Sequence, residues 1–212
     1  MNLTPLQLAS VCGATLANAT LYAPSLNSLS KIGDLTNKAR VAMFLAQVAY
    51  ESSHFNVVEE NLSYSAQRLV AVWPLRFASI TAATPYAHNP PALANRVYGG
   101  RLGNVVGTND GWVFRGRGLI QLTGRANYAR LGAKLSMDLI NHPEQAADPA
   151  TACRLAVQFW IDGSCNAMAD AGNIHNCTLA INGGTNGLDE RTELWHAVSA
   201  NLSKLDPSTY TT

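Results

Sequence analysis

The chain has 212 residues, a formal net charge of +1, and only 14% charged residues, against about 25% in an average soluble domain. A near-neutral chain without a long basic run argues against nucleic acid as a ligand and offers no polybasic segment to a membrane surface. The longest apolar stretch, 41–50, is interrupted by Gln47 and falls short of the roughly 20 residues that a bilayer span requires. We therefore expect a globular protein with no nucleic-acid partner and no membrane insertion.

The start of the chain and its cysteines further restrict the class. The first basic residue is Lys31, so the positive segment that opens a secretory signal is missing and we expect no signal peptide. The chain has four cysteines, Cys12, Cys153, Cys165 and Cys177. Their spacing fits no standard zinc pattern. Buried thiols are the favoured interpretation over a metal site, and we expect no cofactor.

The first half of the chain shows helical patterns. Thr4-Pro5 predicts a helix that ends at Gly13, because Thr caps helices and Pro suits their first position. Residues 22–31, rich in Ser, Asn and Pro, are predicted to be a connector. Thr36 is predicted to cap the next helix. That helix carries apolar residues at the i, i+3, i+4, i+7 spacing of one buried face: Val41, Phe44, Leu45 and Val48.

The remaining segments also favour helices over strands. A helix is predicted from Ser65 to Val72, and a proline-containing loop follows it. The glycine-rich stretch 101–117 is predicted to be a loop or short hairpin. Further helices are expected at 92–97, 127–135, 149–161 and 188–202, a sharp turn at 182–184, and a frayed tail at 206–212. The chain is thus expected to be mainly α-helical, with few short strands.

Two acidic positions stand out in this weakly charged chain. Glu51 closes the apolar stripe of the 36–51 segment, where poor hydration would favour the protonated form that a general acid needs. The alternative is an ordinary glutamate at a helix end, pointing to water. Glu59 and Glu60 follow after a gap that leaves room for a turn. Either can supply a second carboxylate, or simply stabilise the start of a helix.

The segment 114–124 reads FRGRGLIQLTG. Its glycines permit close approach of the backbone to a ligand, and Gln121 and Thr123 alternate with apolar residues. Such side chains suit a groove that holds water or sugar. The segment lacks the Gly-Lys-Ser/Thr ending of a phosphate-binding loop.

Taken together, four ordered motifs resemble the family 19 glycoside hydrolases, and within them the phage and prophage endolysins more than the plant chitinases. The motifs are AQVAYES at 46–52, ENLSYS at 60–65, GRGLIQLT at 116–123, and INGG at 181–184. The resemblance spans roughly residues 38–195. It implies a lysozyme-like helical fold with two lobes flanking a substrate groove. We expect a single catalytic domain over 1–212, with the smaller lobe within 60–115 and no separate wall-binding module.

The resemblance also implies roles for individual residues. Glu51 matches the general acid and Glu60 the base that activates water, with Glu59 as its rival. Thr123 matches the hydroxyl that helps to hold that water. Substrate-contacting or supporting positions are matched by Gln121, Asn127, Asn182 and Arg191.

Two positions depart from the family pattern, and two aromatic residues are additional candidates. Tyr50 stands where many relatives carry His, and Asn186 where plant enzymes tend to carry an acid. Aromatic faces bind sugar rings, which makes Tyr64 and Trp112 candidates for the groove. Large aromatic residues are more often core.

The implied reaction is inverting hydrolysis of a β-1,4 glycosidic bond, in which the two carboxyl groups lie about 6.5–9.5 Å apart so that water fits between base and sugar. We expect a monomeric endolysin that cuts bacterial peptidoglycan and causes host-cell lysis. It would be made in the host cytoplasm and reach the periplasmic wall through a holin. The alternatives are a chitinase of the same family, an antibacterial effector, and a wall-binding protein that has lost catalysis.

Overall fold

The computed structural model describes residues 1–210. Its elements are almost all helices, and the chain divides into two compact units. Unit 1 comprises Met1–Val58, Gly118–Gln121 and the chain from Gln145 onward, and unit 2 comprises Glu59–Arg117 and Leu122–Glu144. Between residues 1 and 210 the only β pairing consists of isolated bridges at Glu59, Arg117 and Leu122, so the expectation of a mainly helical chain is confirmed.

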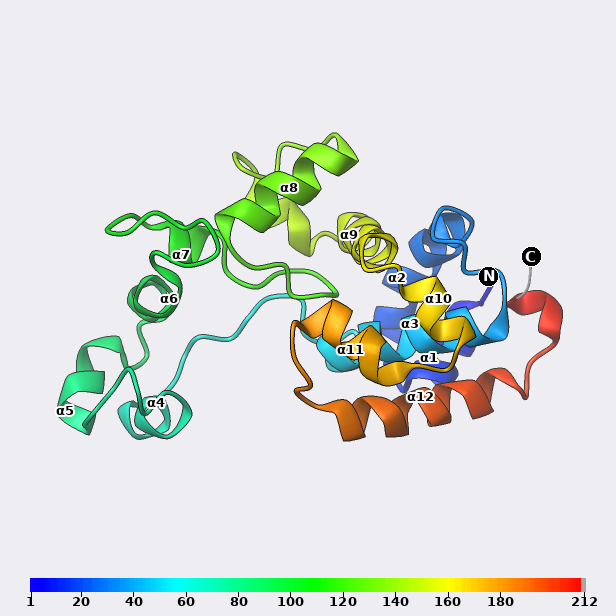
Figure 1. Cartoon of the computed structure of the whole chain (residues 1–212), viewed down its shortest axis with the longest axis horizontal. Helices are drawn as coiled ribbons and strands as arrows, with labels where there is room; N and C mark the ends of the chain where they lie inside the picture. The colour runs from blue at the N-terminus through cyan, green and yellow to red at the C-terminus, as the bar shows by residue number, and fades with distance from the viewer. Residues whose placement is uncertain (211–212) are drawn as a thin grey trace. The chain divides into compact units, whose positions relative to one another are not determined.

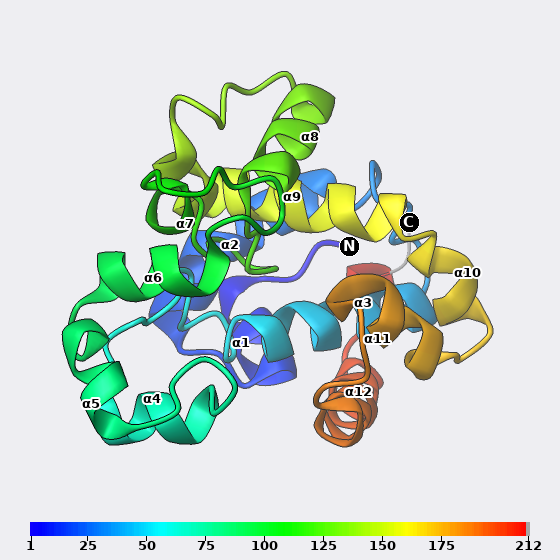
Figure 2. The same cartoon turned by 60° about the vertical axis from the view of Figure 1, so that its left-hand side comes forward.

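Unit 1 is built around one buried helix. Its helices are α1 (Pro5–Cys12), α2 (Leu16–Leu29), α3 (Lys38–Glu51), α9 (Pro149–Asp162), α10 (Cys165–Asp170), α11 (Ile174–Asn182) and α12 (Leu188–Leu202), with a short 3-10 turn at Pro207–Thr209. Figure 1 shows α12 passing alongside α3, and Figure 2 shows α9 running along α2. Because α3 is packed by α1, α10, α11 and α12, it forms the centre of the unit.

The sequence of α3 explains its central place. Every residue from Val41 to Ala49 is buried, and the four residues of the predicted apolar face are at most 2% exposed. A helix that is apolar on all sides belongs in a core. The cap was predicted one residue early: the Oδ1 of Asn37, not Thr36, accepts a hydrogen bond from Arg40 N at 2.9 Å.

The predicted connector at 22–31 is wrong. Helix α2 continues through Pro24 to Leu29, and Tyr22, Ala23 and Leu26 are buried on it. An internal proline removes one helical hydrogen bond and normally costs about 3 kcal/mol. Here burial of the apolar residues against the core outweighs that local preference.

Other boundaries follow the sequence closely. Thr4 and Gln7 form a reciprocal capping box on α1, and Gly13 ends that helix in the left-handed conformation. The last helix, α12, has the predicted bounds. The frayed tail is wrong for the described residues 206–210, because Asn2 N donates to Thr209 O at 2.6 Å and Tyr210 is buried; Thr211 and Thr212 lie outside the described residues.

Unit 2 has a smaller core of its own. Its helices are α4 (Ala66–Val72), α5 (Ile80–Ala83), α6 (Pro90–Tyr98), α7 (Asp110–Val113) and α8 (Arg125–Leu135), with 3-10 turns at Thr84–Tyr86 and, at the boundary with unit 1, Pro143–Ala147. The core residues are Leu62, Leu69, Phe77, Ala83, Leu93, Ala94 and Val97. The loop predicted at 101–117 contains α7. Its Asp110 carboxylate accepts hydrogen bonds from Val105 N and the Arg125 guanidinium at 2.7–2.9 Å, which fixes this irregular segment to α8.

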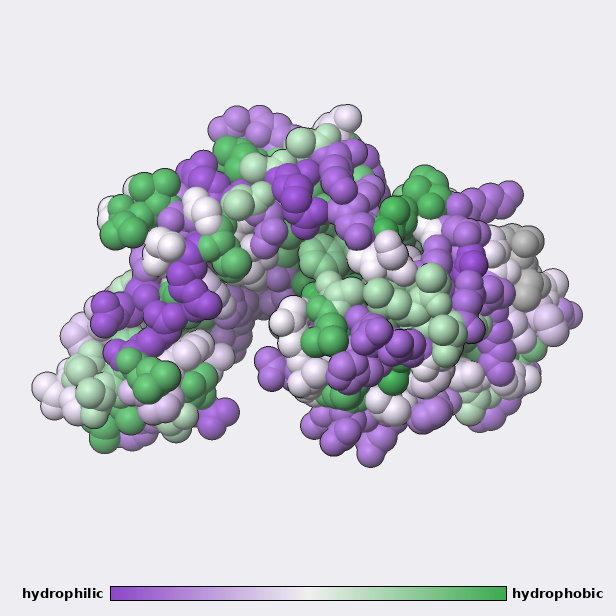
Figure 3. All heavy atoms as spheres, in the orientation of Figure 1, coloured by the Kyte–Doolittle hydropathy of each residue, from purple (hydrophilic) through white to green (hydrophobic). Residues whose placement is uncertain are grey.

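The face of unit 1 that Figure 3 shows has hydrophilic and hydrophobic residues interspersed, rather than one broad hydrophobic area. Within residues 1–210 no helix combines the length and apolar character of a membrane-spanning segment. All four cysteines are buried and unbridged, as predicted for thiols packed in the core.

Candidate functional site

Glu51 is the last residue of α3, so its position is fixed by the core that surrounds this helix. The chain leaves the helix through three successive left-handed residues, Ser53, His54 and Phe55, with φ between 47° and 66°. Such a run is unusual for residues other than glycine. The Ser52 hydroxyl, which donates to Val48 O and accepts from Phe55 N, stabilises the turn. The buried Phe55 ring anchors it.

The Glu51 carboxylate meets a buried cation. The Nη2 of Arg191, on α12, donates to Glu51 Oε1, and the Arg191 side chain is only 2% exposed whereas that of Glu51 is 16% exposed. Arg191 Nη1 donates to Gln47 Oε1 and its Nε to Asn186 O. The expected apolar setting of Glu51 is therefore incomplete, because a guanidinium held inside the unit reaches its carboxylate.

The network extends one step deeper. Gln47 is 2% exposed, and its Nε2 donates to Thr178 Oγ1 of α11 at 3.1 Å. The chain of contacts thus runs from α11 through α3 to α12 and back to the end of α3. Because each buried polar group along it has a partner, the network can hold Arg191 in one orientation.

Tyr50 supports Arg191 by stacking. The guanidinium carbon lies 4.1 Å from the ring centroid, a favourable cation–π geometry. Tyr50 also packs on the start of α12. A Cβ at Gly187, where φ is 69°, would lie 1.8 Å from the Tyr50 hydroxyl oxygen, so both the backbone conformation and the space require glycine there.

In unit 2, Glu60 is held by neutral donors. The Tyr98 hydroxyl donates to Glu60 Oε1 at 2.5 Å, and Gly116 N approaches Oε2 at 3.4 Å. The Glu60 backbone N–H donates to Gly116 O at 2.9 Å. Burial and the adjacent Glu60 carboxylate raise the pKa of Tyr98, so its hydroxyl keeps the proton that it donates.

The neighbouring Glu59 serves a different purpose. Its Oε1 accepts from Arg117 Nε at 2.8 Å, and both of its oxygens lie 3.2 Å from Arg115 Nη2. Although partial burial alone would raise the pKa of Glu59, these two guanidinium groups lower it overall. Glu59 therefore links the 59–60 segment to the 115–117 segment as an ion-pair partner.

The motif at 116–123 forms a tight turn between paired residues. Arg117 and Leu122 exchange two backbone hydrogen bonds, of 3.1 and 2.8 Å, and the four residues between them belong to unit 1. Gln121 has a φ of 50°, and its Nε2 donates to Gly118 O at 3.2 Å. On the unit 2 side, Asn127 Nδ2 donates to Thr123 O at 2.9 Å, which brings these two predicted site residues together.

Asn182 is the last residue of α11 and the first residue of the turn predicted at 182–184. Gly183 terminates the helix in the left-handed conformation, as the Asn-Gly-Gly pattern indicates. The Asn182 Nδ2 atom is buried and makes no hydrogen bond to any of residues 1–210. The Asn182 amide nitrogen is thus bonded to neither Glu51 nor Arg191 in the described part of the chain, and contact of Asn182 with substrate stays a prediction.

The two aromatic candidates both pack on the core of unit 2. Tyr64 lies edge-on to Trp73 with ring centroids 5.4 Å apart, and Trp112 lies under the Arg115 guanidinium at 3.8 Å. Both remain partly exposed. Their packing accounts for these positions, and contact with a sugar stays a prediction.

The sequence did not predict Tyr98 as the hydrogen-bond partner of Glu60, or Thr178 as the residue that anchors Gln47 in the Arg191 network. Tyr98 lies 38 residues from Glu60, and Thr178 lies 131 residues from its partner Gln47, so no local pattern joins either pair. Among residues 1–210 no group of three or more His, Cys, Asp or Glu side chains is arranged to hold a metal ion.

The fold matches solved structures of chitinases. A bacterial family 19 chitinase aligns with a TM-score of 0.62 over 96% of each chain at 20% identity. Chitinase C from Streptomyces griseus aligns with a TM-score of 0.64 over 94% of this chain and 92% of that chain, at 18% identity. At these identities the likeness shows the fold, and it confirms the helical architecture expected from the resemblance.

Sequence comparisons show the family itself. The family described as class I chitinase matches residues 100–179. The acidic 27 kDa endochitinase of Solanum lycopersicum is 38% identical over 84 residues, which cover 39% of this chain and 30% of that protein. A glycosyl hydrolase family 19 domain-containing protein of Haemophilus influenzae is 40% identical over 164 residues, which cover 76% of this chain and 80% of that protein. The chain therefore belongs to glycoside hydrolase family 19, a family of glycosidases.

Proposed function

We propose that this glycosidase is an endolysin that hydrolyses β-1,4 bonds of bacterial peptidoglycan by an inverting mechanism. The observation that carries the proposal is that each unit fixes one glutamate through bonds from its interior. In unit 1 the Arg191 network reaches Glu51, and in unit 2 the Tyr98 hydroxyl reaches Glu60. General acid–base hydrolysis of a glycoside needs two such positioned carboxyl groups.

Glu51 is proposed as the general acid. Its backbone is fixed by the most buried helix of unit 1, and its carboxylate is oriented by Arg191. In the reaction its carboxyl group gives a proton to the glycosidic oxygen as the bond to the anomeric carbon breaks. Arg191, whose Nη2 donates to Glu51 Oε1, can then hydrogen-bond the carboxylate that remains.

Glu60 is proposed as the base, and the contacts of its neighbour support this choice. Glu59 is engaged by two arginines, which bind the lone pairs that a base would offer to water. Glu60 has one oxygen on Tyr98 and a longer approach from Gly116 to the other. Its carboxylate takes a proton from the water that attacks the anomeric carbon. The Thr123 hydroxyl is proposed to help hold that water.

The sugar contacts are proposed for Gln121, Asn127 and Asn182. Their amides can accept from sugar hydroxyls and donate to N-acetyl carbonyls. The unpartnered Nδ2 of Asn182 fits this role, because a buried donor without a partner is costly until a ligand acceptor reaches it. Gln121 and Asn127 each donate one hydrogen bond to a nearby backbone carbonyl, which orients their amide groups.

Peptidoglycan is proposed over chitin as the substrate. Over comparable shares of this chain, 66–76%, the identity is 40% with the bacterial protein of Haemophilus influenzae and 27% with the endochitinases of Persea americana and Arabidopsis thaliana. The four cysteines are free, without the disulfide framework of the plant-type enzymes. Chitin hydrolysis is the second candidate, supported by the chitinase structures that share the fold.

The biological setting is a proposal of its own. As an endolysin the protein would act as a monomer, reach the wall from the host cytoplasm through a holin, and lyse the host. An antibacterial effector would use the same chemistry after a different delivery. A wall-binding protein without catalysis would not need the Arg191 network at Glu51, and the presence of that network favours an enzyme.

The test is digestion of purified peptidoglycan and of chitin by three proteins: the unmodified chain, Glu51→Gln, and the control Glu193→Gln, which alters an exposed glutamate of α12. We expect new reducing ends from peptidoglycan with the unmodified chain and the control, and a loss of about 10²–10⁴-fold with Glu51→Gln. If Glu51→Gln were as active as the unmodified chain, Glu51 could not be the general acid. Products from chitin alone would favour the second candidate, and binding without products the wall-binding alternative.

A further inference from the structure

The loop that follows α4 in unit 2 surrounds a small surface hollow. Residues Val72 to Arg76 line it, and its volume is about 390 Å³. Figure 1 shows this loop between α4 and α5. The carbonyl oxygen of Trp73 accepts hydrogen bonds from Arg76 N at 2.9 Å and from Phe77 N at 3.0 Å, and the Phe77 side chain is buried. The backbone around the hollow is therefore held in place.

The hollow has an aromatic and apolar lining. Leu75 is fully exposed, and Trp73 is half-buried against the core of unit 2. The rings of Trp73 and Tyr64 lie 5.4 Å apart with 75° between their planes, so Tyr64 covers at most one face of the indole. Aromatic and apolar side chains with a few polar groups among them are the usual lining of a ligand site.

Arg76 supplies the cation of the hollow. Within residues 1–210 its guanidinium group forms no hydrogen bond or ion pair, and neither does the indole N–H of Trp73, so both donors are open to a ligand. Three other arginines of unit 2 also lack an ion pair in that range, Arg68, Arg96 and Arg101. Those three are exposed, whereas Arg76 is half-buried.

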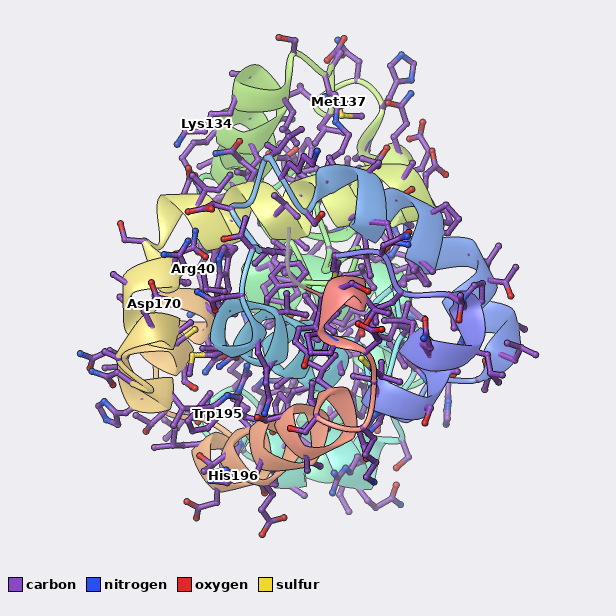
Figure 4. The ribbon with its side chains drawn as sticks, turned by 90° about the vertical axis from the view of Figure 1, so that its right-hand side faces the viewer. Arg40, Lys134, Met137, Asp170, Trp195 and His196 are labelled. Carbon is purple, nitrogen blue, oxygen red and sulfur yellow. The ribbon has the colours of Figure 1, made fainter. Side chains whose placement is uncertain are left out.

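Other half-buried arginines of the protein hold carboxylates. In unit 1, Arg40 Nε lies 2.9 and 3.0 Å from the two carboxylate oxygens of Asp170, and Figure 4 shows these two side chains together. In unit 2, Arg115 Nη2 lies 3.2 Å from Glu59 Oε1. The hollow therefore contains a guanidinium group in a setting where this protein elsewhere places a carboxylate beside it.

The hollow and Glu60 belong to the same unit. From Glu60 the chain runs through the buried Leu62 to Tyr64, which packs on the same core. Four residues of chain span at most about 14 Å, and Tyr64 contacts Trp73. The hollow is thus within reach of a polymeric glycan that is held at Glu60.

Charge favours an anionic ligand for this unit. Residues 59–117 and 122–144 include nine arginines and lysines but five aspartates and glutamates, a net charge of +4, whereas the rest of the chain has six against nine, a net charge of −3. A guanidinium group offers two parallel donors that match a carboxylate. Of the two candidate substrates, only peptidoglycan carries carboxylates, on its stem peptides or on lactyl groups that bear no peptide.

We propose that the hollow at residues 72–76 is a subsite for a carboxylate-bearing muramoyl residue of the peptidoglycan strand. The Trp73 ring lies against the sugar, and Arg76 binds the carboxylate. This inference rests on the proposed hydrolysis of peptidoglycan and adds a residue that distinguishes that substrate from chitin. Because Arg76 does not touch the bond that breaks, its removal should raise KM for peptidoglycan and leave kcat nearly unchanged.

The experiment measures binding of soluble glycans to the full chain carrying Glu51→Gln, so that hydrolysis does not consume the ligand. The ligands are peptidoglycan oligomers, the same oligomers with their carboxylates converted to amides, and chitohexaose. Oligomers freed of stem peptides by an amidase show whether the lactyl or the peptide carboxylate is bound. Arg76→Gln is compared with Arg96→Gln, which removes the same charge from an exposed position on α6.

We expect Arg76→Gln to weaken binding of the untreated oligomers by about tenfold and to leave binding of the amidated oligomers and of chitohexaose unchanged. Arg96→Gln should alter none of the three affinities by more than about twofold. Equal effects of the two variants would overturn the subsite, and so would equal losses by Arg76→Gln on untreated and amidated oligomers. Without any variant at position 76, equal affinity for untreated and amidated oligomers would overturn it as well.

Hydrolysis by the chain without substitutions keeps the two proposals apart. If that chain releases no products from peptidoglycan, the proposed function fails. If it releases them with the same KM and kcat as Arg76→Gln, only the subsite fails. A rise of about tenfold in KM for peptidoglycan, with the same kcat and melting temperature, is the result that supports the subsite.

Discussion

The two units hold their candidate carboxylates by different physical means. In unit 1, Glu51 meets the buried guanidinium of Arg191. In unit 2, Glu60 accepts from the neutral hydroxyl of Tyr98. Hydrogen bonds between charged groups are about twice as strong as neutral ones, but a buried charge that loses its partner costs far more than a lost neutral bond.

The difference suits the two proposed roles. A group that gives up its proton is helped by a cation beside it when the negative charge appears. A group that accepts a proton from water needs an available lone pair and a fixed orientation, and a single neutral donor provides the orientation. The difference is therefore consistent with the proposal that Glu51 is the acid and Glu60 the base.

The largest expected effect separates Glu60 from Glu59. Glu60→Gln should lower the rate of hydrolysis by about 10²–10⁴-fold while leaving the melting temperature nearly unchanged. Glu59→Gln should weaken its contacts with Arg115 and Arg117 and cost about 1 kcal/mol of unfolding free energy, with a much smaller effect on the rate. Initial rates on peptidoglycan and urea unfolding measure the two effects. A larger loss of rate in Glu59→Gln would reverse the assignment of the base.

Substitution of Arg191 should have the next largest effect. Arg191→Ala removes a buried charge from three acceptors, Gln47, Glu51 and Asn186, and should cost about 3–5 kcal/mol. Arg191→Lys keeps the charge but not the fork of donors, and misplacement of Glu51 should lower the rate by about a hundredfold. Arg68→Lys, on the exposed side of α4, is the matched control. Full activity of Arg191→Lys would show that charge alone, without geometry, suffices.

Tyr98→Phe tests the neutral contact in unit 2. The ring stays packed while the hydrogen bond to Glu60 is lost, so the rate should fall by about tenfold and stability by about 1 kcal/mol. Tyr86→Phe, which alters a ring packed on Phe77 in the same unit, should change neither. Equal behaviour of the two variants would mean that Tyr98 does not position Glu60.

The smallest effect concerns the stability of unit 2 in acid. The Arg125 guanidinium lowers the pKa of Asp110 from 3.8 to about 2. The stability that Asp110 contributes is therefore complete above about pH 4 and lost as the pH falls through the folded-state value. Asp110→Asn should lower the free energy of unfolding by about 1–2 kcal/mol at neutral pH. This gap between the variant and the unmodified chain should close near pH 2, as urea unfolding at several pH values can measure. A gap that stays constant with pH would contradict the assignment.

Local signals predicted much of the fold. Helix ends with a clear cap, at Thr4, Ser65 and Gly13, were placed to within a residue, and so was the apolar face of α3. The error at 22–31 arose because Pro24 signals a break, whereas tertiary burial of Tyr22 and Leu26 decides the outcome.

In the candidate site, too, local signals predicted some features and missed those that depend on tertiary packing. Motif order was enough to single out Glu51, Glu60 and Arg191, but it could not reveal the partners that orient them. Tyr98 and Thr178 reach the site through the packing of separate helices, and long-range pairs of this kind leave no periodic trace in the sequence.

The most direct test of the account is the anomeric configuration of the first product, followed by proton NMR from the start of digestion of a soluble β-1,4-linked substrate. An acid and a base on opposite sides of the anomeric carbon, with water delivered by the base, yield the α-anomer before mutarotation. We predict that the α-anomer is the first product of the unmodified chain and that Glu60→Gln no longer forms it. A β-anomer at first turnover would contradict the proposed roles of Glu51 and Glu60.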